Sequence, residues 1–130
     1  MMTKQANLPI PTEAELELLA VLWSKGSATV REVHEEIGHE RALGYTTVLK
    51  MFQRMMEKGL VQRTEAGKAH TYRPSVSQQE TQSQMLRDLS KRLFAGSSTQ
   101  LAMHALSMQS PSVQELEEVR KILEERSGKR

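Results

Sequence analysis

The stretch LGYTTVLKMFQRMMEKGLVQRTEAGKAHTYRP, residues 43–74, decides the fold. Apolar side chains recur at three- and four-residue intervals in its first half, which predicts a helix over residues 45–58. The positions that share the inward face of this helix are Val48, Phe52, Met55 and Met56. Gly59 stands where the end of a helix favours a left-handed residue. Two short runs, residues 60–64 and 70–73, then flank a glycine-containing tip and predict a β-hairpin.

The outward face of this predicted helix is polar and has no carboxylate before Glu57. It offers hydroxyls, an amide and cations, which come from Thr46, Thr47, Lys50, Gln53 and Arg54. A polar helix followed by a basic-tipped hairpin is typical of a winged helix on duplex DNA, in which the helix enters the major groove and the hairpin follows the backbone. These five residues are therefore candidates for DNA contact.

The position of each candidate suggests what it contacts. Thr46 and Thr47 lie near the helix N-terminus and can meet a thymine methyl, a base edge or a phosphate. Lys50, one turn further on, can reach a guanine edge or the backbone. Arg54 has two interpretations, a phosphate contact or a tie to a structural carboxylate. The candidate contacts from the hairpin are Lys68 at its tip and His70.

The distribution of charge supports this interpretation better than the formal net charge of +2 does. Residues 12–40 contain seven acidic and two basic side chains, whereas residues 41–75 contain seven basic and two acidic ones. The basic segment coincides with the predicted helix and hairpin, as expected for a surface that meets phosphates. The alternative is a solvated basic surface without a partner.

The composition excludes several other classes of protein. The chain has no cysteine, so it has no disulfide framework, Cys-ligated zinc or cysteine nucleophile. Its histidines are scattered, and His34 and His39 lack the i, i+4 spacing of a helical chelate, so no metal site is expected. No catalytic motif appears, which predicts a non-enzyme without a cofactor. No apolar run is long enough to span a bilayer, and a cytoplasmic location is expected.

Capping signals divide the rest of the chain into helices. Thr12-x-x-Glu15 predicts a helix through Ser24, with Gly26 closing it. Thr29-x-x-Glu32 predicts a short helix that ends at Gly38, so that residues 29–56 have the dimensions of a helix-turn-helix. The remaining predicted helices are residues 78–94 after Ser77-x-x-Glu80, residues 99–108, and residues 112–126 after Ser110 with Pro111 at the first helical position. Trp23 and Tyr72 are expected in the core.

The C-terminal helices carry apolar stripes that three short helices cannot bury among themselves. A second copy offering the same stripes would bury them, which predicts a homodimer. The alternative is that these helices pack on the winged helix of their own chain. The predicted dimerisation residues are Leu86, Leu89, Leu93, Leu101, Leu106, Leu116, Val119, Ile122 and Leu123.

The predicted fold is therefore mainly α with a small β-hairpin: a winged helix-turn-helix over residues 1–75, followed by a helical dimerisation module over residues 76–130. The alternative function is a winged-helix protein-interaction module that does not bind DNA. Such a module would present apolar residues at the positions of Thr46, Thr47 and Lys50.

The sequence resembles the bacterial penicillinase-repressor family, the BlaI/MecI-like regulators. The resemblance covers the first 75 residues well and the remainder loosely. The matching elements are residues 8–15 leading into Leu22-Trp23, Thr29-Val30-Arg31-Glu32-Val33, Tyr45-Thr-Thr-Val48, Arg54, Glu57-Lys-Gly-Leu60, and residues 67–74.

The resemblance implies a homodimeric repressor that binds a palindromic operator on double-stranded DNA. It also implies dimerisation through the C-terminal helices and a membrane sensor-protease partner that cuts within them to relieve repression. In the family the cut falls at an Asn-Phe bond, at the position that residues 103–106 occupy here. This chain contains no Asn-Phe dipeptide.

Overall fold

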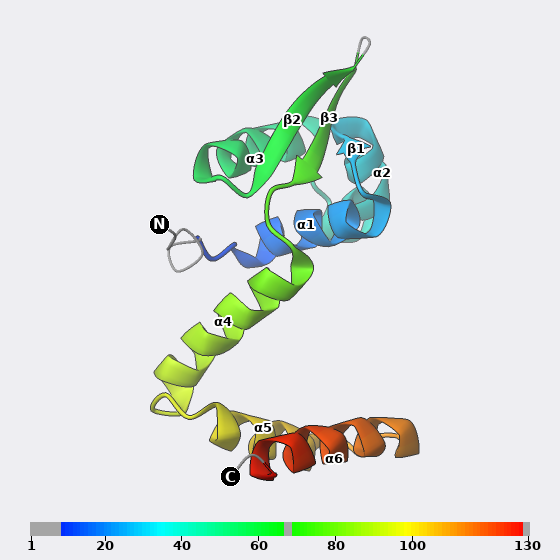
Figure 1. The fold of residues 1–130 in the computed structure, drawn as a ribbon. Coiled ribbons are helices and arrows are strands. Elements are labelled where there is room, and N and C mark those ends of the chain that lie inside the picture. Colours follow the sequence, from blue (N-terminus) through cyan, green and yellow to red (C-terminus); the bar gives the residue numbers. More distant parts are fainter. Residues whose placement is uncertain (1–8, 67–68, 129–130) are drawn as a thin grey trace. The chain divides into compact units, whose positions relative to one another are not determined.

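The computed structural model describes residues 9–66 and 69–128 of the 130-residue chain. The elements are α1 (Glu13–Lys25), β1 (Ala28–Thr29), α2 (Val30–Arg41), α3 (Tyr45–Lys58), β2 (Val61–Ala66), β3 (Ala69–Pro74), α4 (Gln78–Leu93), α5 (Ser98–Met108) and α6 (Val113–Ser127) (Figure 1). This order confirms a mainly helical fold with a winged helix-turn-helix in its first part. The chain forms two compact units, Met1–Met85 and Leu86–Arg130, which are described separately below. The functional division at residue 75 stays a prediction.

The sheet of the first unit has the order β1-β3-β2, with both pairs antiparallel. The predicted hairpin is present with longer strands than expected, since Val61 pairs with Pro74 at its base and Ala66 with Ala69 near its tip. Figure 1 shows the hairpin extending beyond the helices of this unit. The third strand, β1, was not predicted. It pairs with the middle of β3, where Ala28 lies opposite Tyr72 and Thr29 opposite Thr71.

The helix ends of the first unit follow the sequence signals in all but one place. Thr12 and Thr29 form the predicted capping boxes, and α3 covers the predicted residues with a left-handed Gly59 (φ 87°) after it. The prediction that α2 ends at Gly38 is wrong. The helix continues to Arg41, and Ala42 (φ 56°) is the left-handed residue that ends it.

The second unit differs from the prediction at the start of its last helix. Ser112 is the N-cap of α6 and forms a capping box with Glu115, so Pro111 precedes the cap and is not the first helical residue. The start of α5 is capped by Ser97, whose hydroxyl accepts from the Gln100 N–H.

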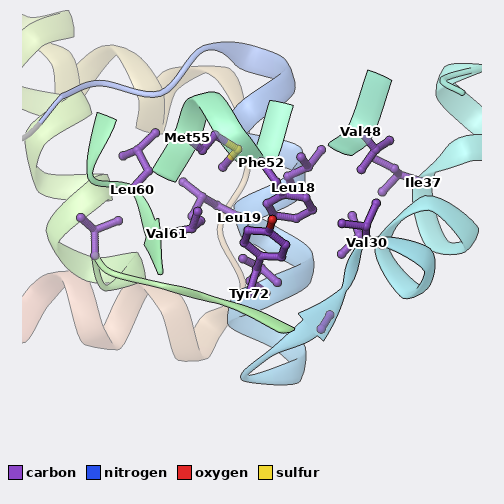
Figure 2. Packing of buried hydrophobic residues seen from close by; sticks show 14 residues of the cluster. Leu18, Leu19, Val30, Ile37, Val48, Phe52, Met55, Leu60, Val61 and Tyr72 are labelled. Atoms are coloured by element: carbon purple, nitrogen blue, oxygen red, sulfur yellow. The ribbon is translucent and has the colours of Figure 1, made fainter. Parts of the chain in front are cut away.

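The core of the first unit lies between α1, α2, α3 and the sheet (Figure 2). Phe52 and Tyr72 are both buried and stack with their ring centroids 4.6 Å apart. Met56 packs against this cluster while partly exposed. Trp23 also packs at the edge of the cluster, and its indole N–H donates to the Val76 carbonyl at 3.0 Å. Because Val76 is itself buried, the segment that leads into α4 is anchored to the winged helix.

Candidate nucleic-acid interface

A partly buried ion pair, between Lys58 and Glu15, holds the end of α3 against the start of α1. Glu15 is 4% exposed, and its Oε1 accepts from Lys58 Nζ at 2.7 Å and from the Thr12 N–H at 2.9 Å. Burial acts to raise the pKa of Glu15, but the hydrogen bonds from Lys58 and Thr12 and the charge of Lys58 together hold this pKa below its usual range. Lys58 also lies in the last turn of α3, where a cation suits the helix dipole.

Two further contacts support the turn between α2 and α3. Arg41 donates two hydrogen bonds to the Glu17 carboxylate on α1, from Nε at 2.7 Å and from a terminal nitrogen at 2.6 Å. The hydrogen bond from Arg41 is the main reason that the pKa of Glu17 is lowered. On the other side of the turn, His34 Nε2 lies 2.9 Å from the Leu43 carbonyl oxygen. The start of α3 is therefore fixed by contacts from both preceding helices.

The face of α3 opposite the core is exposed, as the sequence predicted. Val48, Phe52 and Met55 are buried, which fixes how the helix is rotated about its axis. The residues that this rotation leaves in solvent are Thr46, Thr47, Lys50, Gln53 and Arg54, with Tyr45 half exposed at the first position. The exposed face carries hydroxyl, amide and cationic groups that can donate to phosphates or base edges.

The hairpin places one acidic side chain among its cations. His70 is exposed and lies opposite Glu65 across the strands, with its Nδ1 3.9 Å from the Glu65 carboxylate. Arg63 lies 3.5 Å from the same carboxylate. Lys68, the predicted contact at the tip, lies outside the described residues.

An open groove of about 760 Å³ runs between the N-terminus of α2, α3 and the hairpin. It brings together Gln53 and His70 from the predicted set, whereas Thr46, Thr47, Lys50 and Arg54 are not among its lining residues. Two cations in its lining, Arg31 and Arg63, were not among the predicted contacts. Their positive charge was visible in the sequence, but their proximity depends on the packing of α2 against the sheet. The residues that line the groove are Thr29, Val30, Arg31, Glu32, Tyr45, Leu49, Gln53, Arg63, Ala69, His70 and Tyr72.

Some cations on and beside α3 have no carboxylate partner among the described side chains, unlike the cations whose ion pairs hold the helices together. Lys25, Arg41 and Lys58 each pair with a glutamate. Among the side chains that the structure describes, which leave out those of residues 39, 40 and 66–68, Arg31, Lys50 and Arg54 make neither an ion pair nor a hydrogen bond. For Arg54, the described side chains, to which Glu40 does not belong, therefore provide no structural carboxylate partner. Basic groups without an internal partner remain available for an external anion.

The second unit exposes apolar side chains along all of its helices. Leu93 is 68% exposed and Leu123 62%, values that are unusual for leucine in a folded chain. Leu101 and Val119 are partly buried, and Val119 lines a hollow of about 420 Å³ together with Leu106. The other predicted dimerisation residues that are exposed in the single chain are Leu86, Leu89, Leu106, Leu116 and Ile122.

Other kinds of site are not found in the described part of the chain. The described side chains of residues 9–66 and 69–128, which leave out residues 39 and 40, include no group of three or more metal-ligating side chains placed to hold an ion. Over the same residues, none of the helices combines the length and the apolar character that crossing a bilayer requires.

Comparison with known proteins agrees with this geometry. The profile of the penicillinase repressor family matches residues 11–125. The penicillinase repressor of Bacillus licheniformis is 24% identical over 124 residues, which cover 95% of this chain and 97% of that protein. The transcriptional regulator BlaI of Mycobacterium tuberculosis is 33% identical over 92 residues, which cover 70% of this chain and 67% of that protein.

A solved structure shows the same winged-helix fold in complex with DNA. It is the monomeric form of Bacillus licheniformis BlaI in complex with the blaP half-operator, with a TM-score of 0.51 and 26% identity over 57% of this chain and 90% of that chain. The resemblance found in the sequence is therefore confirmed over most of the chain. The chain belongs to the penicillinase repressor family and is a DNA-binding transcriptional repressor, not an enzyme.

Proposed function

We propose that the chain is a homodimer that represses transcription by binding a palindromic operator, with one winged helix on each half-site. The observation that carries this proposal is the exposed face of α3, which presents donors and unpaired cations beside a groove lined by Arg31, Arg63 and His70. That Bacillus licheniformis BlaI has been solved on a half-operator supports the same use of this fold here.

The exposed residues divide into two roles by their place on the winged helix. Thr46, Thr47, Lys50 and Gln53 lie on the part of α3 that enters the major groove and therefore contact base edges. The remaining polar and basic side chains contact phosphates and set the register of the protein on the duplex. These backbone contacts are Arg31, Arg54, Arg63, Lys68 and His70.

The dimer forms through the apolar stripes of α4, α5 and α6. Their exposure in the single chain supports this, because a second copy would remove them from water. Repression is relieved when the dimerisation helices are lost or their contacts are broken, since each head then binds its half-site separately. A sensor-protease that cuts this part of the chain is a partner that could cause such a loss, at a bond other than Asn-Phe.

The test is to enrich duplexes from a random library with the full chain and to measure binding at rising salt. Repressor function predicts an enriched palindrome whose affinity falls as salt rises. Lys50→Ala is expected to change the preferred base at one position in each half-site, and Lys68→Ala to weaken all duplexes alike. Failure to enrich any sequence would favour the protein-interaction alternative, although Thr46, Thr47 and Lys50 are not the apolar residues that such a module would expose.

A further inference from the structure

The turn that leads into α3 has little support of its own. It passes through Ala42 in the left-handed conformation (φ 56°), and the N-cap of α3 is Gly44, which has no side chain to cap the helix. A helix start without a side-chain cap leaves its first N–H groups without that restraint. The direction in which α3 leaves the turn must therefore be fixed by contacts from other elements.

His34 of α2 supplies such a contact. Its Nε2 lies 2.9 Å from the Leu43 carbonyl oxygen. Because a carbonyl oxygen only accepts, Nε2 carries the hydrogen and donates it. The same ring meets the ring of Tyr45 edge to face, with centroids 6.1 Å apart and an interplanar angle of 78°. One side chain thus contacts the residues on both sides of Gly44, and Tyr45 also lines the groove beside α3.

Gly38 explains how the His34 ring is accommodated. A glycine inside a helix is less favourable than alanine, and Gly38 is neither at the helix end nor in a left-handed conformation. A Cβ added there would lie 3.2 Å from both Cδ2 and Nε2 of His34, and 3.6 Å from the Leu43 oxygen. To make room for such a methyl group, the ring would have to move by a few tenths of an ångström from the place where it meets the Leu43 oxygen. The absence of a side chain at position 38 therefore leaves the space that the His34 ring occupies.

We propose that His34 is a positioning residue for operator recognition, which fixes the turn before α3 through the Leu43 carbonyl and the Tyr45 ring. His34 does not touch DNA in this proposal. It sets the angle at which α3 presents Thr46, Thr47 and Lys50 to the base edges. The inference rests on the proposed operator binding, and it predicts a loss of discrimination between sequences rather than a uniform loss of affinity.

The experiment uses the full chain and two probes, the duplex of about 30 bp that the wild-type protein enriches and a shuffled duplex of the same composition. The readout is the ratio of the two dissociation constants. His34→Ala is expected to lower this ratio roughly threefold to tenfold, the effect of one lost hydrogen bond. His34→Gln keeps a donor at the position of Nε2 and should stay within about twofold of wild type. Fluorescence of Trp23, the single tryptophan of the chain, checks that each variant is folded.

Gly38→Ala provides an independent variant, because it favours the helix but crowds the ring. It should lower the ratio in the wild-type background and change nothing further when His34 is already alanine. Equal ratios for wild type and His34→Ala, or additive effects of the two substitutions, would overturn the positioning role. If the wild-type chain enriches no duplex, the proposed function itself is wrong. If His34→Ala unfolds, the comparison of Gly38→Ala with His34→Gln decides, since only the first should lose discrimination.

Discussion

Replacing Lys58 by methionine should destabilise the winged helix more than the same replacement of any other lysine that forms an ion pair. The Glu15 side chain is 5% exposed and that of Lys58 29%, so the substitution leaves a nearly buried carboxylate without its cation. Removing one partner of a buried pair costs about 3–5 kcal/mol, and an exposed pair contributes about 0–1 kcal/mol. Because Lys58 is partly solvated, we expect Lys58→Met to lower the free energy of unfolding by about 2–3 kcal/mol at neutral pH.

The pH dependence of this loss follows from the lowered pKa of Glu15. A carboxyl group with a lowered native pKa stabilises the fold above its unfolded pKa, and this contribution disappears as the pH falls through the native pKa. In Lys58→Met the unpaired Glu15 takes up a proton more readily, which relieves the cost of burying its charge. The difference in stability between wild type and variant should therefore shrink on acidification.

Urea unfolding followed by the fluorescence of Trp23 measures this difference, since this side chain belongs to the first unit and reports on it alone. The comparison is made at about pH 7 and at about pH 4, close to the ordinary pKa of glutamate. Lys25→Met is the matched control, because its pair with Glu36 is 3.8 Å long and both side chains are well exposed. The control should cost at most about 0.5 kcal/mol. Equal losses for both variants, or a Lys58→Met effect that grows at low pH, would refute the reasoning.

Three further predictions concern the dimer, the hairpin and the joint. Leu123→Asp should weaken the dimer on the order of a hundredfold or more, since an uncompensated buried carboxylate costs at least about 3 kcal/mol. The control Gln114→Asp, on the opposite face of α6, should leave the dimer intact, and sedimentation shows which variant is monomeric. Glu65→Gln should raise the affinity for every duplex about twofold to fivefold at about 50 mM salt, with a smaller gain at higher salt, as titrations with shuffled DNA would show. A fragment of residues 1–85 should remain folded and bind the enriched duplex more weakly than the full chain. A fragment that ends at residue 75 should have a lower thermal stability, because it lacks the buried Val76 side chain and the Val76 carbonyl that accepts from the Trp23 indole.

The parts of the fold that the sequence predicted well are those with local signals. The bounds of α3 follow from the spacing of its apolar residues and from Gly59, and the capping boxes of Thr12 and Thr29 each combine two side chains within one turn. By contrast, β1 is two residues long, and its second residue, Thr29, is itself the N-cap of α2. It exists because Ala28 and Thr29 pair with residues more than forty positions away, and no local pattern reports such pairing.

The errors in the prediction have similar physical origins. Gly38 resembled a helix end because glycine commonly follows one, but here it makes room for a ring that packs over the helix. The polar face of α3 could be predicted because amphipathic spacing fixes which side faces water. The approach of Arg31 and Arg63 to the groove could not, because it depends on how α2 packs against the hairpin.

The unbroken course of α4 has a consequence for the construction of chimaeric regulators. The helix runs from Gln78 to Leu93 across the boundary between the two units at Met85. Each residue of an α-helix adds about 100° of rotation and about 1.5 Å of rise. One residue inserted after Met85 would turn the apolar stripe of Leu86, Leu89 and Leu93 by about 100° around the axis of α4, whereas seven inserted residues would restore the helical phase to within about 20°. A foreign dimerisation helix grafted after Met85 therefore keeps its apolar stripe on the side of α4 that Leu86, Leu89 and Leu93 occupy only if the number of inserted residues preserves this helical phase.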